Sequence, residues 1–164
     1  MKGAALQHTV GIAEMKIANQ PEDVLVTYSL GSCIGLALYD PQARIGGLIH
    51  CMLPLSTIDP GRARQTPCMF TDAGVPLLIQ SMLDAGAKPG RLVAKVAGAA
   101  ALLNNSNTFR IGERNRVVLR KLLWRHGILM AGEDTGGTAA RTMFLHLDSG
   151  AAIIRSAGRE YELT

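Results

Sequence analysis

Three apolar runs separated by turn signals lie in the first third of the chain, and they constrain its fold more than any other feature. Residues 24–30 and 33–39 are apolar and partly β-branched, and a Gly-Ser pair separates them. Residues 45–53 form the third run, which follows an Asp-Pro turn signal. Such runs between such breakers predict three β-strands, of which the last two return on each other.

The rest of the chain alternates between helical and extended patterns. An apolar stretch at 71–85 predicts a helix that begins at Thr71 and ends before Gly86. A second helix is expected at 113–126, with an apolar face made of Val117, Val118, Leu122 and Trp124. Residues 56–69 lack periodicity and predict a loop. Further strands are expected at 9–15, 92–96, 128–131, 142–147 and 151–156, the last two forming a hairpin.

The length and composition indicate one globular domain spanning residues 1–164. The chain has 48% hydrophobic and 18% charged residues, which is typical of a packed core rather than of disorder. The net charge of +4 is scattered, and only 4% of the residues are aromatic, so few rings are present to stack on bases. We therefore expect no nucleic-acid partner.

The cysteines and the hydropathy pattern indicate a cytoplasmic protein. The three cysteines are odd in number and irregularly spaced, which favours reduced thiols over a disulfide framework. The N-terminus has no signal-peptide pattern because Glu14 and Lys16 interrupt it. No apolar run reaches the roughly 18 residues that would span a bilayer, so we expect no membrane insertion.

Cys33 and His50 are the candidate reactive pair, because they lie on the second and third apolar runs. If residues 40–43 form the loop, Tyr39 pairs with Arg44 and Cys33 stands directly across from His50. A slip of one residue places Cys33 opposite Cys51 and turns His50 to the other face. The sequence permits both registers.

A thiol beside an imidazole is a nucleophile of known chemistry. A neighbouring imidazolium stabilises the thiolate, which is the reactive form of Cys33. Backbone N–H groups of Gly31 and Ser32 are candidates to bind an oxyanion at the tight turn, and Thr27 is a candidate to orient the ring. The alternative is that Cys33 is a small buried hydrophobe and His50 a structural residue. A metal site is a weaker alternative because no CxxC or HxxxH spacing is present.

Several motifs together resemble the CheD family of chemoreceptor glutamine deamidases. They are Thr27-Tyr28-Ser29-Leu30-Gly31-Ser32-Cys33, Tyr39-Asp40-Pro41, Gly46-Gly47-Leu48-Ile49-His50, Met52-Leu53-Pro54, Ile111-Gly112-Glu113-Arg114-Asn115 and Gly136-Gly137. The resemblance covers nearly the whole chain.

This resemblance implies a fold, an activity and partners. The fold it implies is α/β, with mixed and antiparallel β-sheets packed in layers and two or three helices outside, as in the cytotoxic necrotising factor deamidases. The implied catalytic set maps onto Cys33, His50 and Thr27, without a cofactor or metal. The implied substrates are glutamine side chains of methyl-accepting chemotaxis receptors.

The family resemblance also implies a second role, which is complex formation with a CheC-type phosphatase. A regulatory binding module is therefore the alternative function, and Phe109 is the candidate contact residue. A thiol protease or transglutaminase shares the same acyl chemistry, and motif spacing does not separate it from a deamidase.

Two segments depart from the family pattern. The usual Phe-Gly-Gly-Ala segment is Ala97-Gly98-Ala99-Ala100 here, and a usual Gly-Arg is Ala140-Arg141. Alanine in place of glycine matters wherever the backbone requires a positive φ. We expect an effect on partner binding or loop shape rather than on the catalytic groups.

Overall fold

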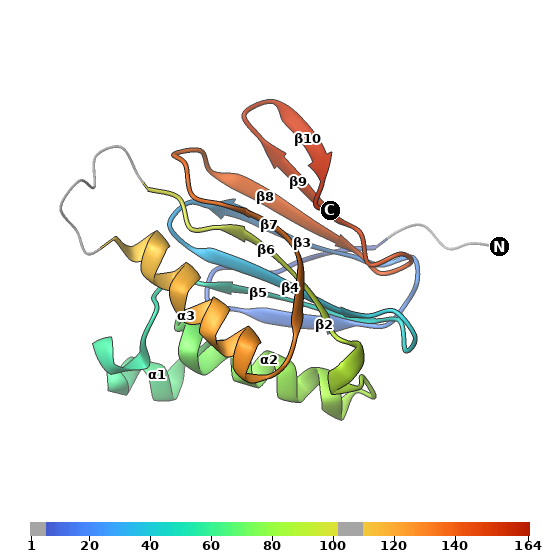
Figure 1. Cartoon of the computed structure of the whole chain (residues 1–164), viewed down its shortest axis with the longest axis horizontal. Helices are drawn as coiled ribbons and strands as arrows, with labels where there is room; N and C mark the ends of the chain where they lie inside the picture. Colours follow the sequence, from blue (N-terminus) through green and yellow to red (C-terminus); the bar gives the residue numbers. More distant parts are fainter. Residues whose placement is uncertain (1–5, 102–109) are drawn as a thin grey trace.

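The computed structural model describes residues 6–101 and 110–164 and has three layers (Figure 1). Two five-stranded sheets pack face to face, and the helices cover the outer face of one of them. The α/β layered fold expected from the sequence is confirmed. No helix in these two ranges is long and apolar enough to cross a membrane.

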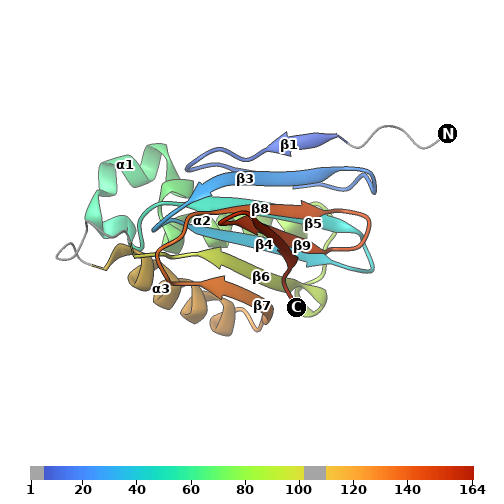
Figure 2. The same ribbon diagram turned by 90° about the horizontal axis from the view of Figure 1, so that it is seen from above.

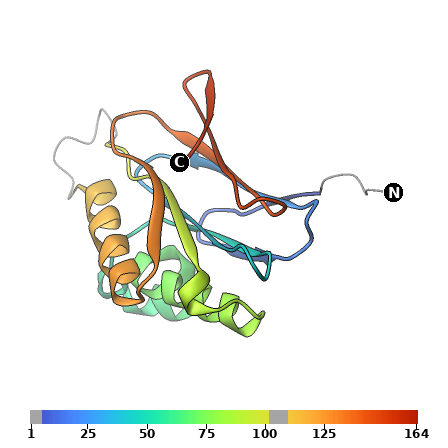
Figure 3. The same cartoon turned by 45° about the vertical axis from the view of Figure 1, so that its right-hand side comes forward.

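Sheet A has the strand order β1-β3-β8-β9-β10. Its β1–β3 pair is parallel and its other pairs are antiparallel. The strands are β1 (Gln7–Thr9), β3 (Val24–Leu30), β8 (Arg141–His146), β9 (Ala152–Ser156) and β10 (Arg159–Glu162). The β9–β10 hairpin projects away from the helical layer (Figure 3).

Sheet B has the strand order β2-β5-β4-β6-β7, and only its β6–β7 pair is parallel. The strands are β2 (Met15–Ala18), β4 (Ile34–Asp40), β5 (Ile45–Cys51), β6 (Val93–Gly98) and β7 (Leu129–Thr135). Both β4 and β5 are buried along their whole length, because sheet A covers one face and helices cover the other. This explains why these strands are continuous apolar runs rather than alternating ones.

The helices pack on sheet B through stripes with helical spacing. In α2 (Thr71–Asp84) the buried positions include Gly74, Val75, Leu78 and Met82. In α3 (Ile111–Arg125) the buried positions are Gly112, Asn115, Leu119, Leu122 and Leu123. The expected apolar face of this second helix is confirmed in part: Leu122 is buried and Val118 packs against the core, whereas Val117 is 44% exposed and Trp124 is 83% exposed.

Two further expectations from the sequence were wrong, and one strand was not expected. The predicted strand at 9–15 is two short strands on different sheets, joined by a turn. The predicted loop at 56–69 contains 3-10 turns at Ser56–Ile58 and Pro67–Met69 and the short helix α1 (Pro60–Gln65). Strand β10 was missed, because all four of its residues are exposed and give no apolar signal.

Several elements end at the same edge of the molecule and together frame one region. Seen from above, the carboxyl ends of β3 and β6, the first turn of α3 and the helix α1 all lie toward the left (Figure 2). Figure 1 places them at the same side. Cys33 lies in this region, in the connection that leads from β3 on sheet A to β4 on sheet B.

Candidate active site

Cys33 lies in a three-residue crossover between the two sheets, and its side chain is half-buried against the core between them. The crossover follows an irregularity at the end of β3, where Ser29 has a φ of 60°. The carbonyl groups of the crossover all accept hydrogen bonds. That of Gly31 accepts from the Ala100 N–H at 2.8 Å, and that of Cys33 accepts from the Ala99 N–H at 2.7 Å.

The turn that follows β6 supports this crossover at very close range. A Cβ atom at Gly98 would lie 2.3 Å from the Cys33 carbonyl oxygen, and Gly98 has a φ of +108°. Only glycine is compatible with both conditions. The next residue, Ala99, also has a positive φ, of 53°.

The two departures from the family pattern therefore differ in consequence. Ala99 stands where the resemblance implies a glycine, and its backbone is left-handed, so strain at a positive φ is present there. Ala140 does not have a positive φ. The second departure consequently causes no backbone strain of this kind.

His50 lies on β5, and its register with β4 differs from both registers considered for the sequence. His50 pairs with Gly35, and Cys51 pairs with Ile34. The expected cross-strand pair of Cys33 with His50 was therefore wrong, because the loop comprises residues 41–44 and β4 extends to Asp40. Cys33 precedes β4 by one residue.

The register is fixed by the carboxylate of Asp40, which is fully buried. Its oxygens accept hydrogen bonds from Arg91, from the Lys88 N–H and from two N–H groups of the loop. These donors lower the pKa of Asp40 from 3.8 to about 2, against the opposing effect of burial. Held in this way, Asp40 remains in the strand and pairs with Ile45.

Despite the corrected register, Cys33 and His50 remain on the same side of sheet B. Side chains alternate along a strand, so position 33 shares the face of positions 35, 37 and 39, which points toward sheet A. His50 points to that face as well, since it contacts Thr27 of sheet A. Neighbours displaced by two residues lie about 7–8 Å apart, within the reach of an aromatic ring.

The hydrogen bonds of Thr27 determine the tautomer of His50. The Thr27 hydroxyl donates to the carbonyl oxygen of Val10 at 2.7 Å, and the same Oγ1 lies 2.7 Å from His50 Nδ1. A carbonyl oxygen only accepts and a hydroxyl has a single hydrogen, so Nδ1 must be the donor to Thr27. The proton of the neutral imidazole is thus on Nδ1, and Nε2 carries the lone pair.

The Nε2 atom of His50 is buried and has no hydrogen-bond partner among the described residues, Cys33 included. His50 itself is 0% exposed. Burial lowers the pKa of His50 from 6.5 to about 4, and burial also raises the pKa of the Cys33 thiol. Both shifts favour a neutral imidazole and a neutral thiol over the ion pair expected from the sequence.

Two backbone N–H groups at the crossover are available to bind a negatively charged oxygen. The N–H groups of Ser32 and Cys33 donate to no oxygen or nitrogen atom in the described part of the chain, and the Cys33 N–H faces the sulfur of its own residue, whereas the Gly31 N–H donates to the Ser29 carbonyl at 3.0 Å. Gly31 is therefore not a free donor, and this corrects the prediction made for it. Ser32 stays a candidate, and Cys33 replaces Gly31.

Asn115 is a site residue that the sequence reasoning missed. It is 0% exposed, and its side-chain amide donates to the carbonyl groups of Ser32 and Met52, both at 3.0 Å. The signal that points to it is a polar residue in the buried stripe of α3. Phe109, the predicted phosphatase contact, lies outside the described residues, so that contact stays a prediction.

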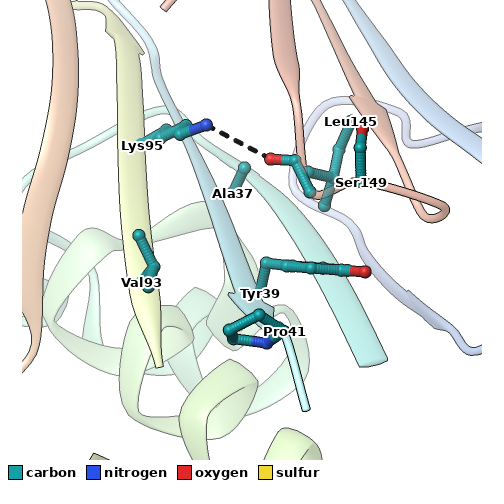
Figure 4. A pocket seen from close by; sticks show the side chains of 8 residues that line it. Ala37, Tyr39, Pro41, Val93, Lys95, Leu145 and Ser149 are labelled. Carbon is teal, nitrogen blue, oxygen red and sulfur yellow. Dashed lines mark hydrogen bonds between the residues drawn. The ribbon is translucent and has the colours of Figure 1, made fainter. Parts of the chain in front are cut away.

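A cavity of about 140 Å³ lies elsewhere, at the opposite end of β4 (Figure 4). It is lined by Tyr39, Val93 and Lys95 among others, and Lys95 Nζ donates to the Gly150 carbonyl at 3.3 Å. None of Thr27, Cys33 and His50 lines it. Within residues 6–101 and 110–164, no three His, Cys, Asp or Glu side chains gather closely enough to hold a metal ion.

Comparison with known proteins identifies a family. Residues 52–156 match the model of the CheD family, described as chemotactic sensory transduction. A protein of Solibacter usitatus named probable chemoreceptor glutamine deamidase CheD is 49% identical over 157 residues, covering 96% of this chain and 93% of that protein. The resemblance inferred from the motifs is thereby confirmed.

Two further relatives carry corresponding names. A probable chemoreceptor glutamine deamidase CheD 1 of Syntrophus aciditrophicus is 44% identical, covering 91% of this chain and 93% of its own length. One from Symbiobacterium thermophilum, named probable chemoreceptor glutamine deamidase CheD, is also 44% identical, with 94% and 95% covered. The family-model match begins two residues after His50. The relatives, in contrast, match over nearly the whole chain.

Proposed function

The chain belongs to the CheD family of chemotaxis proteins, and we propose that it is a glutamine deamidase that converts glutamine side chains of chemoreceptors to glutamate. Relatives that match it nearly end to end are named as such deamidases. We place the reaction in the cytoplasm, where a catalytic thiol stays reduced. Cys33 is the proposed nucleophile, His50 the base and Thr27 the residue that orients it.

One observation carries the assignment of the base. Thr27 holds the Nδ1 proton of His50, which leaves the Nε2 lone pair buried, unpartnered and on the face to which Cys33 belongs. A buried polar atom without a hydrogen bond destabilises the folded protein and is rare, and a catalytic role is one explanation for its presence. In free enzymes, catalytic hydrogen bonds are often long and tighten when substrate binds.

In the first half of the reaction, His50 Nε2 removes the proton from the Cys33 thiol as its sulfur attacks the amide carbon of the glutamine. A C–S bond forms, and the carbonyl oxygen becomes an oxyanion that accepts hydrogen bonds from the Ser32 and Cys33 N–H groups. The C–N bond then breaks, and the imidazolium gives its proton to the departing ammonia. The product of this half is a thioester between Cys33 and the receptor side chain.

In the second half of the reaction, water hydrolyses the thioester. Neutral His50 accepts a proton from the water molecule as its oxygen attacks the thioester carbon. The C–S bond breaks, the sulfur recovers the proton from the imidazolium, and the receptor carries a glutamate. The net reaction consumes one water and releases one ammonia, and it requires no cofactor.

The resting charges make His50 a general base rather than one half of an ion pair. Its pKa of about 4 keeps the imidazole neutral near neutral pH, while the raised pKa of Cys33 keeps the thiol protonated. Proton transfer therefore accompanies the attack. Activity is expected to fall in acid as His50 becomes protonated and loses its lone pair.

The test is deamidation of a purified receptor cytoplasmic domain, read by mass spectrometry as conversion of glutamine to glutamate. We expect Cys33→Ala to abolish conversion, and Cys68→Ala to retain it, because Cys68 is a second half-buried cysteine outside the proposed mechanism. Conversion by Cys33→Ala at the wild-type rate would refute the mechanism. Cleavage of the receptor backbone instead of conversion would assign a protease.

A further inference from the structure

Asn115 occupies a position in α3 that a hydrophobic residue would ordinarily fill. It belongs to the buried stripe of this helix, between Gly112 and Leu119, and it is 0% exposed. A buried amide is destabilising unless its donors and acceptor are satisfied. At Asn115 they are satisfied by groups of the crossover and of neighbouring elements.

The orientation of the Asn115 amide is determined by its three partners. Its Nδ2 lies 3.0 Å from the carbonyl oxygens of Ser32 and of Met52. Both partners can only accept, so the atom between them must be the NH2 group, which uses one hydrogen for each. Its Oδ1 accepts a hydrogen bond from the Thr71 hydroxyl at 3.1 Å.

The bond to Ser32 also fixes the direction of another group. The Ser32 carbonyl and the Cys33 N–H belong to the same peptide unit, and the described chain has no cis peptide bonds. In a planar trans unit the C=O and the N–H point in opposite directions. Holding the Ser32 carbonyl toward α3 therefore turns the Cys33 N–H away from α3, where among the described residues it faces only the sulfur of its own residue and no oxygen acceptor.

The bond to Met52 links this crossover to the strand of the base. Met52 lies two residues after His50, just beyond the last ladder pair of the β4–β5 hairpin, Ile34 with Cys51. Beyond that pair, no ladder hydrogen bond connects the segment that precedes β4 with the segment that follows β5. The Asn115 amide connects these two segments, with one N–H donated to Ser32 and the other to Met52.

We propose that Asn115 is a positioning residue that aims the Cys33 N–H at the developing oxyanion and fixes the crossover relative to the end of β5. This inference rests on the proposed function, since it assigns a role within that mechanism. It also separates two properties of Cys33. Acyl transfer requires the oxyanion donor, whereas alkylation of the thiol by iodoacetamide develops no oxyanion.

The experiment compares both reactions in Asn115→Leu and in the wild type. We expect kcat for receptor deamidation to fall on the order of 10²-fold, the effect of losing one oxyanion donor, with KM within about threefold. The alkylation rate of Cys33, followed by peptide mass spectrometry, should stay within about threefold. Asn115→Ala removes both donors without adding a charge or apolar bulk, and it repeats the test if the leucine variant does not fold.

Thr71→Val is the matched control, because it removes the bond to Asn115 Oδ1 and leaves both donor bonds in place. It should lower the melting temperature and leave the ratio of deamidation to alkylation at the wild-type value. Equal losses of both reactions in the Asn115 variants would overturn the proposal, as would an unchanged kcat. Failure of the proposed function is a separate result, namely wild-type protein that alkylates at Cys33 and does not deamidate receptors.

Discussion

Replacing Thr27 by valine tests the central hydrogen bonds of the site with almost no change of shape. The hydroxyl joins the Val10 carbonyl to His50 Nδ1, with both distances at 2.7 Å and the residue 0% exposed. Valine leaves one buried carbonyl and one buried N–H without partners, and each costs about 1–3 kcal/mol. Some of this cost is offset by the added apolar group. We expect Thr27→Val to lower the free energy of unfolding by about 2–4 kcal/mol.

The same change removes the constraint on the imidazole. Without Thr27 as acceptor, the proton is no longer held on Nδ1, and the tautomer with a protonated Nε2 becomes populated. Because that tautomer has no lone pair toward Cys33, we expect kcat to fall on the order of 10²-fold. Urea unfolding near neutral pH measures the stability, and receptor deamidation measures kcat.

Thr27→Ser is the control, because it keeps the hydroxyl and loses one methyl group. It should cost about 1 kcal/mol from the lost methyl group and retain most of kcat. A valine variant within about 0.5 kcal/mol of the serine variant would refute the proposed hydrogen-bond chain. Equal kcat values for the two variants would refute the role in selecting the tautomer.

Two further predictions concern protonation and backbone strain. Between about pH 7 and pH 4 the unfolded chain takes up a proton at His50 before the folded protein does, since burial lowers its pKa from 6.5 to about 4. Stability therefore falls as the pH falls, by about 3 kcal/mol more in the wild type than in His50→Gln, as measured by urea unfolding at each pH. Ala99→Gly should raise the free energy of unfolding by about 1 kcal/mol, because glycine adopts the positive φ without strain, and a variant that melts below the wild type would contradict this expectation. Gly98→Ala should lose both stability and activity, because its Cβ would meet the Cys33 carbonyl.

The strands of the hairpin were predictable from the sequence, but their register was not. Continuous apolar runs gave β3 with its observed bounds and β4 and β5 to within two residues. The register depends on Asp40, whose buried carboxylate binds Arg91 and the Lys88 N–H, some 50 positions further along the chain. A local turn pattern contains no information on such distant donors. The prediction consequently ended the strand at Tyr39, one residue early.

The residues proposed as catalytic were identifiable from the sequence, whereas the contacts that support them were not. Cys33, His50 and Thr27 lie within apolar runs whose motifs resemble a family, so the sequence alone pointed to them. Asn115 contacts segments more than 60 residues away. Its signals in the sequence are its place in the motif at residues 111–115 and its interruption of a helical apolar stripe, and neither indicates which groups its amide binds.

Gly35 explains how a side chain as short as threonine reaches a histidine on the other sheet. Packed sheets ordinarily lie about 10 Å apart, a distance filled by side chains from both sides. Gly35 pairs with His50, and a Cβ there would lie 2.8 Å from a methyl carbon of Leu30 on sheet A. The missing side chain lets sheet A approach at this point, and Thr27 lies on the same strand as Leu30. Glycine inside a buried apolar strand indicates such a close approach. This residue, which weakens β4 as a strand, is therefore what allows Thr27 to determine which nitrogen of His50 carries the lone pair.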